Sequence, residues 1–298
     1  MNDKQFPSCI TRLRAPATRR SCLPRVRPCR HADCLKIIRM RQARWRDTLP
    51  TMSTFVLVHG AWQSAGTWDL LTPLLQKSGH EVVTPTLSGL GTDPNPLSDA
   101  ITFHQHVQDV SRAVSKCRGK VILVGHSYAG MIISGVAETN PDQIARLIFV
   151  DAFIPDHGQS ALDLLPAAIV DYFRDTARQH GNGWRLPAGE GQLDLWGLKP
   201  GNARDFVRDR LCDFTLRCFE GPIDLPTDQK RSLPATFVQC AAEDYPARPF
   251  FAPFADKARA LGWHVVEVPT GHDCHVERPQ EIADILMSNI GTSSTSLK

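Results

Sequence analysis

The stretch VILVGHSYAGM, residues 121–131, decides the fold that this sequence predicts. Its first four residues are apolar and small residues follow, which is typical of a buried strand that turns directly into a helix. At the turn, Gly125 to Ala129 read G-H-S-Y-A, which matches the nucleophile pattern G-x-S-x-G except for the final alanine. Because alanine adds only one methyl group to the turn, we predict that Ser127 stands there as a nucleophile. A serine that caps the following helix is the alternative.

On either side of this stretch, short apolar runs alternate with segments of helical periodicity. This order predicts an α/β fold with a mostly parallel six-stranded sheet flanked by helices. Residues 154–232 interrupt it with many prolines and glycines and are too long for a plain loop, so we predict an inserted cap over the carboxyl ends of the strands, where such sheets place their sites. The predicted strands are 54–60, 81–87, 120–125, 145–153, 235–241 and 263–269, and the predicted helices are 68–80, 101–117, 128–140, 248–262 and 277–290.

Charge divides the chain near residue 51. Residues 1–51 hold thirteen Lys and Arg against three Asp, whereas residues 52–298 hold twenty-one basic and twenty-eight acidic residues. We therefore expect a basic, disordered extension over 1–51, with a mitochondrial-type transit peptide as the alternative, and a folded domain over 52–298 that does not bind nucleic acid. The sequence contains no run of eighteen apolar residues, so no membrane span is predicted. Its nine cysteines are irregularly spaced and do not suggest a disulfide framework, so a cytoplasmic protein is expected.

A nucleophilic serine requires a base, and in strand–turn–helix sites of this kind the chain order is serine, acid, histidine. The stretch TGHDCHVERP, residues 270–279, follows the last predicted strand. We predict His272, in the loop after that strand, as the base, with His275 as the alternative. His264 lies inside the strand and is disfavoured.

The acid is expected at the end of the preceding strand, where FVQCAAEDYP (237–246) offers Glu243 and Asp244. We predict Asp244, 28 residues before His272, as the carboxylate that orients the imidazole and stabilises the imidazolium. Asp151 and Asp273 are weaker candidates, and the side chain of Asp273 should point away from its neighbour in sequence, His272.

Two backbone amides are needed to stabilise an oxyanion. We predict the amide of Tyr128, directly after the serine, and the amide of Ala61 in the loop VHGAW (58–62), where Gly60 permits close backbone approach. His59 and His126 are expected to hydrogen-bond the backbone near the two turns rather than to react.

Cofactors and metals are not predicted. The sequence has no glycine-rich phosphate-binding loop and no C-x-x-C pair, and His272, Cys274 and His275 supply metal-ligand types without the spacing of a structural zinc site.

The segments FVLVHGAW, LVGHSYAGM, IFVDAFIPD, and EDYP followed by GHDCHVERPQ resemble the α/β-hydrolase branch of the plant hydroxynitrile lyases and of the plant methylesterases that act on methyl salicylate or methyl jasmonate. The resemblance spans about residues 54–290, is weakest in the cap, and implies a homodimer like that of the plant members. Its serine-triad lyases carry a threonine in the first loop and a lysine directly after the catalytic histidine. Gly60 and Asp273 stand at those positions here, and a carboxylate cannot stabilise departing cyanide. Asp273 also departs from the uncharged residue of the esterase members.

The expected function is therefore a carboxylic-ester hydrolase without a cofactor. It would act through an acyl-enzyme on small-molecule esters, and the aromatic residues of 154–232 suggest small or aromatic substrates, although they could equally be packing of the cap. A hydroxynitrile lyase on the same triad and a non-catalytic ligand-binding scaffold are the alternatives.

Overall fold

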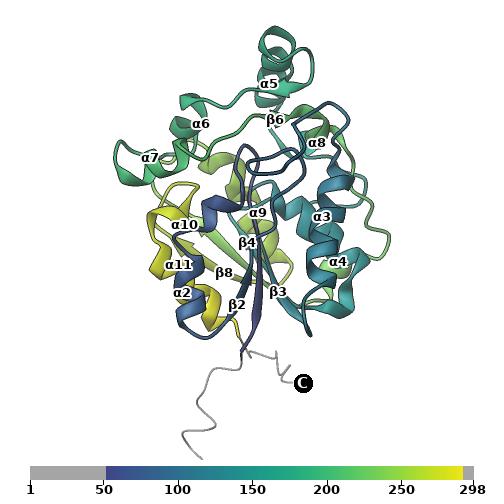
Figure 1. The fold of residues 1–298 in the computed structure, drawn as a ribbon, viewed down its shortest axis with the longest axis vertical. Coiled ribbons are helices and arrows are strands. Elements are labelled where there is room, and N and C mark those ends of the chain that lie inside the picture. Colours follow the sequence, from purple (N-terminus) through teal and green to yellow (C-terminus); the bar gives the residue numbers. More distant parts are fainter. Residues whose placement is uncertain (1–51, 291–298) are drawn as a thin grey trace, which may run out of the picture. The chain divides into compact units, whose positions relative to one another are not determined.

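The computed structural model describes residues 52–290. The basic segment 1–51, with the predictions made for it, lies outside the described residues. In the described part, six parallel strands form one sheet in the order β2-β1-β3-β4-β7-β8 (Figure 1). The strands are β1 Thr54–Val58, β2 Glu81–Val83, β3 Val121–His126, β4 Ile144–Val150, β7 Ala235–Cys240 and β8 His264–Val268.

The sheet confirms the α/β fold predicted from the alternating apolar runs. β1, β3 and β7 are buried along their whole length, as expected of parallel strands covered on both faces. The helices between strands begin and end within a few residues of the predicted bounds, but the first predicted helix, 68–80, is shorter and follows a short 3-10 turn, η1 Ala65–Trp68. The helices that flank the sheet are α2 Thr72–Lys77, α3 Phe103–Ser115, α4 Ala129–Thr139, α9 Arg248–Ala260, α10 Cys274–Glu277 and α11 Pro279–Ser288.

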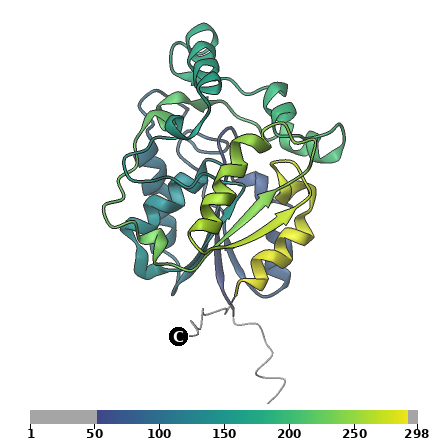
Figure 2. The same ribbon diagram turned by 180° about the vertical axis from the view of Figure 1, so that it is seen from behind.

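Helix pairs flank the sheet. α2 contacts α11, and α3 contacts α4, while α9 packs on β7 and β8 (Figures 1 and 2). Within residues 52–290, none of the helices combines the length and the apolar character that crossing a membrane requires.

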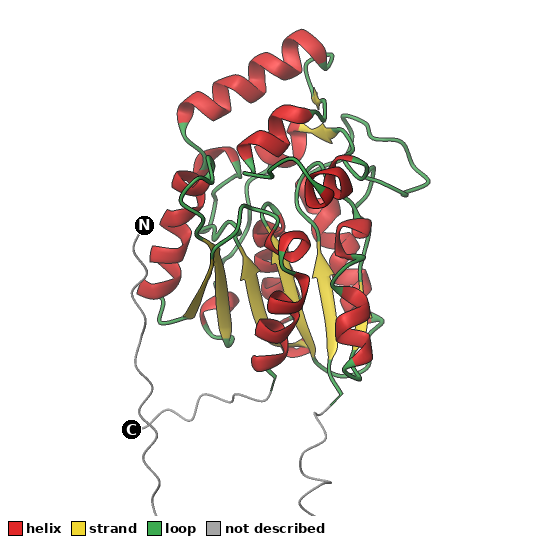
Figure 3. Cartoon of the chain, turned by 90° about the vertical axis from the view of Figure 1, so that its left-hand side faces the viewer, coloured by secondary structure: helices red, strands yellow, loops and turns green. Residues whose placement is uncertain are grey.

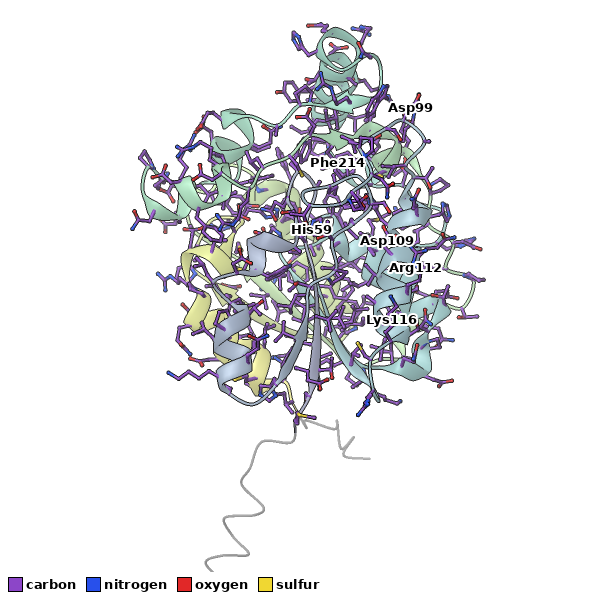
Figure 4. All side chains as sticks on the ribbon, in the orientation of Figure 1. His59, Asp99, Asp109, Arg112, Lys116 and Phe214 are labelled. Carbon is purple, nitrogen blue, oxygen red and sulfur yellow. The ribbon has the colours of Figure 1, made fainter. Side chains whose placement is uncertain are left out.

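The segment between β4 and β7 lies beyond the carboxyl ends of the strands, where Figure 3 shows helices above the sheet. A two-stranded antiparallel ribbon stands among them, and Figure 4 places Phe214 of this ribbon above His59, which follows β1. The predicted cap is therefore present as a folded layer over the end of the sheet at which an α/β site forms. Its elements are η3 Leu162–Leu164, α5 Ala167–His180, β5 Arg185–Leu186, α6 Glu190–Leu195, α7 Asn202–Arg208, β6 Phe214–Thr215 and α8 Leu216–Glu220. The chain then returns to β7 through η4 Gln229–Arg231, which contacts α4 rather than the cap.

Candidate active site

Ser127 stands between β3 and α4 with a φ of 58°, in the left-handed region that non-glycine residues rarely adopt. Its amide donates to the carbonyl oxygen of Val150 at 3.1 Å, and its own carbonyl accepts from the amides of Gly130 and Phe153, each at 3.1 Å. These bonds to β4, to α4 and to the segment just after β4 fix the turn. Strained backbone held by its surroundings is typical of functional sites, and it is what the sequence motif predicts for a nucleophile.

Small residues allow this turn to form. A Cβ on Gly125 would lie 2.8 Å from the carbonyl oxygen of Ala129, and a Cβ on Gly130 would lie 2.1 Å from that of Phe153. The turn therefore requires glycine at 125 and at 130, whereas the structure accommodates the alanine at 129, which is completely buried at the start of α4. The departure from G-x-S-x-G does not disturb the motif.

His272 lies in the loop after β8, as predicted. Its amide donates to the Trp196 carbonyl of the cap at 2.8 Å, and the Nε2 of His126 donates to its carbonyl oxygen at 3.1 Å. The imidazole is 1% exposed and packs against the ring of Phe251, with 4.4 Å between ring centroids. Among the described residues its Nε2 has no hydrogen-bond partner, so this nitrogen is available to accept a proton.

The carboxylate beside His272 belongs to Asp151, not to Asp244. The Oδ2 of Asp151 lies 2.7 Å from His272 Nδ1, and both side chains are buried. Asp244 is 69% exposed and pairs with the Nζ of Lys199 at 2.9 Å. The structure therefore does not bring the predicted acid, Asp244, to His272, and it places Asp151 there instead. Because β4 and β7 are neighbours in the sheet, an acid after either strand satisfies the chain order, and the residue after β4 is the one that points to the histidine.

Asp151 follows directly after β4, and the backbone holds it in place. Its φ is 42°, again in the left-handed region, and its amide donates to Val238 O of β7 at 2.7 Å. Its Oδ1 accepts from the amide of Cys240 at 3.2 Å, and its Oδ2 accepts from the hydroxyl of Tyr245 at 2.9 Å. Every oxygen of this buried carboxylate is thus hydrogen-bonded, as a buried charge requires.

Burial acts on both members of the pair. It raises the pKa of Asp151, and the hydrogen bonds from Tyr245 and from the Cys240 amide oppose that rise. It lowers the pKa of His272, which favours the neutral imidazole that can accept a proton at Nε2. Since the two groups share one hydrogen bond, they titrate as a pair.

The first loop, after β1, lies against the serine. A Cβ on Gly60 would lie 3.0 Å from the Cβ of Ser127, so a side chain at this position would crowd the serine. Ala61 and Tyr128 both line the cavity next to Ser127. No backbone carbonyl in the described part of the chain accepts a hydrogen bond from the amide of either residue. The two predicted oxyanion donors thus lie on the two segments that meet at the serine.

His59 and His126 hold these turns, as predicted. His59 donates from Nδ1 to Gly60 O at 2.9 Å and accepts at Nε2 from the amide of Leu87 at 3.3 Å. Burial lowers the pKa of His59 to about 4, so the ring is neutral and can use one nitrogen as donor and the other as acceptor.

Three further buried side chains could by type hold a cation. Ligand atoms of His126, Asp273 and His275 lie within 4.8 Å of one another. His275 is instead bonded through Nε2 to the Thr67 hydroxyl at 3.0 Å and packs on Trp68, with 4.3 Å between ring centroids. Asp273 accepts from Gln63 Nε2 at 2.5 Å, and its Oδ1 lies 4.0 Å from His275 Nε2. His275, the alternative base, is thus engaged with η1.

A cavity of about 320 Å³ opens next to Ser127, between the sheet and the cap. Trp62 of the first loop lies on its wall and donates from Nε1 to the Leu186 carbonyl of the cap at 3.0 Å. Of the seven aromatic residues in 154–232, four line this cavity, namely Tyr172, Phe173, Trp196 and Phe219. Trp184, Phe206 and Phe214 do not line it, and Phe214 packs against Tyr128 instead. The other lining residues are Phe153, Leu165, Ile169, Gly191, Gln192, Leu195, Ala247, Phe250 and Phe251.

The sequence matches the alpha/beta hydrolase family over residues 55–285. The chain belongs to this family. It is 33% identical to a carbendazim hydrolyzing esterase of Nocardioides sp. (strain SG-4G) over 243 residues, which cover 79% of this hydrolase and 98% of that esterase. It is also 34% identical to methylesterase 8 of Arabidopsis thaliana over 124 residues, 41% of this hydrolase and 44% of the plant protein.

A solved structure gives the same result for the fold. An extracellular α/β-hydrolase from a Paenibacillus species, described as homologous in structure and function to tobacco salicylic acid binding protein 2, superposes with a TM-score of 0.69 at 28% identity. The superposition covers 81% of this hydrolase and all of that chain. These relatives confirm the resemblance to the methylesterase branch, and the named esterases among them confirm that this hydrolase is an enzyme of the esterase type.

Proposed function

We propose that this hydrolase cleaves carboxylic esters through an acyl-enzyme, with Ser127 as nucleophile, His272 as base and Asp151 as the carboxylate that orients His272. The observation that carries the proposal is the buried contact of 2.7 Å between His272 Nδ1 and Asp151 Oδ2. It fixes the proton on Nδ1, which leaves Nε2 free to act as a base.

In the first step, the Ser127 oxygen attacks the ester carbonyl carbon as His272 Nε2 takes the hydroxyl proton. The negative charge on the carbonyl oxygen is stabilised by the amides of Tyr128 and Ala61. The imidazolium of His272, stabilised by Asp151, then gives its proton to the departing alcohol. Water repeats the sequence on the acyl-enzyme, which releases the acid and restores Ser127.

The lining of the cavity supports esters with an apolar or aromatic group. Its walls are almost wholly aliphatic and aromatic, and polar groups are few, Ser127 and Gln192 among them. A cavity of about 320 Å³ is at the small end of ligand pockets. The Nocardioides relative, which is matched over 98% of its length, is named for the hydrolysis of carbendazim, so carbendazim is one of the substrates to test.

Cyanohydrin cleavage is less well supported. The residue after His272 is Asp273, which is completely buried and hydrogen-bonded to Gln63. Burial raises the pKa of Asp273 to about 7. This side chain carries no positive charge in either form and does not line the cavity next to Ser127, so it does not supply a cation for departing cyanide.

The test is the hydrolysis of 4-nitrophenyl acetate, butyrate and benzoate and of carbendazim by the purified full chain, with cyanide release from mandelonitrile measured in parallel. Ser127→Ala should lose at least about 10³-fold in kcat/KM. Ser134→Ala, which removes a buried hydroxyl from α4, the helix that follows Ser127, is the control and should retain activity. Hydrolysis that survives in Ser127→Ala would exclude the mechanism, and saturable binding of these esters without turnover by the wild type would favour a binding scaffold.

A further inference from the structure

Tyr245 reaches the pair formed by Asp151 and His272 from the loop between β7 and α9. Its hydroxyl lies 2.9 Å from Asp151 Oδ2 and 3.0 Å from His272 Nδ1. Because Oδ2 of an ionised carboxylate only accepts, the phenol donates its proton to Asp151, beside the proton that His272 donates to the same atom.

The position of this hydroxyl is fixed. Tyr245 is 3% exposed, its ring stacks on that of His272 with 6.0 Å between centroids, and its amide donates to Ala242 O at 3.3 Å. Gly197 of the cap lies against the ring, where an added Cβ would come within 3.4 Å of Cδ2. The sequence places Tyr245 next to Asp244, so the loop expected to supply the acid supplies a phenol instead.

We propose that Tyr245 is a positioning residue that keeps Asp151 ionised and thereby holds His272 in the Nδ1–H tautomer. This inference rests on the proposed function for its catalytic meaning. Two hydrogen bonds from neutral donors, the phenol and the Cys240 amide, stabilise the charged form of the carboxylate and so oppose part of the effect of its burial. Removing the phenolic hydroxyl leaves Oδ2 with the imidazole alone, so the carboxylate becomes more basic and the pair holds its extra proton to a higher pH.

Other ionisable groups around the pair set the background for this effect. Burial raises the pKa of the Cys240 thiol well above its usual range, and burial lowers the pKa of His126, so both face the pair as neutral groups. The carboxyl of Asp273 interacts electrostatically with Asp151, and it is hydrogen-bonded to Gln63 rather than to Tyr245. In the described part of the chain, the ionisable side chains on the elements around Asp151 and His272 are Cys240 of β7, Tyr245 of the following loop, His126 of β3, Asp273 beside His272, and Cys274 and His275 of α10.

The experiment compares the wild type with Tyr245→Phe in two measurements. The protonation of the His272 imidazole is followed by NMR with labelled histidine as the pH is changed, and kcat/KM for 4-nitrophenyl butyrate is measured over the same range. Since a hydrogen bond to a charged group is equivalent to about one pKa unit or more, we expect the titration midpoint and the acid limb of kcat/KM to move up together by about one pH unit. Asp244→Asn, in the same loop, is the control and should leave both midpoints in place.

The outcomes separate the possible roles. A lower rate with an unmoved midpoint would show that Tyr245 only fills space, and it would overturn the proposal. A second pair of variants distinguishes an effect through the carboxylate from a general structural effect. In an Asp151→Asn background, adding Tyr245→Phe should change the titration midpoint of His272 little, because the tyrosine acts through the carboxylate. A further shift of similar size in that background would also overturn the proposal. If the wild type does not hydrolyse esters but Tyr245→Phe still shifts the titration midpoint of His272, the proposed function is refuted. The link between Tyr245 and the pair of Asp151 and His272 is then still established.

Discussion

His272 Nδ1 lies 2.7 Å from the Oδ2 of Asp151, the residue directly after β4. Asp244, in the loop after the neighbouring strand β7, is exposed and paired with Lys199. The first prediction follows from this relationship. Asp151→Asn should lower kcat/KM for ester hydrolysis by about 10³-fold or more, because an amide permits the wrong imidazole tautomer. Asp244→Asn should stay within a few-fold of the wild type. The reverse ranking in steady-state assays would place the acid at the end of β7.

The second prediction concerns the turn at Ser127. Gly125→Ala places a methyl group 2.8 Å from the carbonyl oxygen of Ala129, and overpacking of this kind costs about 1–3 kcal/mol. We expect a lower urea midpoint and loss of activity at temperatures where the variant is folded. Gly189→Ala is the control, since its Cβ would meet nothing closer than 3.8 Å. Equal activity in the two variants would show that the turn tolerates a side chain at 125.

The third prediction concerns the cavity. Leu165 lines it, and its neighbour Leu164 does not. Leu165→Trp should reduce kcat/KM for a benzoate ester by about tenfold relative to an acetate ester, since apolar pockets discriminate by size at about this level. Leu164→Trp should not change the ratio of the two esters. A ratio that is unchanged in Leu165→Trp would place the acyl group outside this cavity.

The fourth prediction is the pH dependence of stability. Burial lowers the pKa of His59 and of His106 to about 4, and those of His126 and His275 fall well below their usual value. Below pH 6.5 these histidines therefore bind protons in the unfolded chain but not in the folded chain, and the free energy of unfolding falls as the pH falls. Each such histidine contributes about 1.4 kcal/mol per pH unit over that range.

Carboxyl groups oppose this trend only in part. Burial raises the pKa of Asp273 to about 7, so this group favours the folded state at lower pH, and the opposite shifts of Asp151 and His272 offset each other. The four buried histidines outnumber the one opposing carboxyl, Asp273. The free energy of unfolding, measured by urea titration, should therefore decrease from pH 6.5 to pH 4.5. A flat or rising free energy over this range would mean that the histidines are charged in the folded protein.

Much of the site was accessible from sequence because local patterns determine it. The apolar run at 121–124 with small residues after it predicts the turn at Ser127, and the position of His272 after the last strand follows from chain order. The cap was predicted from what interrupts the alternation, but not its short ribbon β5–β6, whose two-residue strands give no periodic signal.

The structure places Asp151 beside His272 where the sequence favoured Asp244, because carboxylates follow two neighbouring strands, β4 and β7. The choice between Asp151 and Asp244 depends on side-chain direction, which the left-handed backbone at Asp151 sets and which no periodicity reveals. A signal was nevertheless present: Asp151 ends a strand that is apolar in its last four residues, where a charged side chain needs a partner. Tyr245 gave no signal, since a tyrosine beside Asp244 reads as ordinary packing.

The central claim is that His272 and Asp151 activate Ser127, and reaction with a fluorophosphonate probe followed by peptide mass mapping tests it most directly. We predict labelling of the wild type on Ser127 alone, strongly reduced labelling in His272→Ala and in Asp151→Asn, and labelling at the wild-type rate in Asp244→Asn. An unlabelled wild type that is folded, or labelling that persists in His272→Ala, would contradict the account.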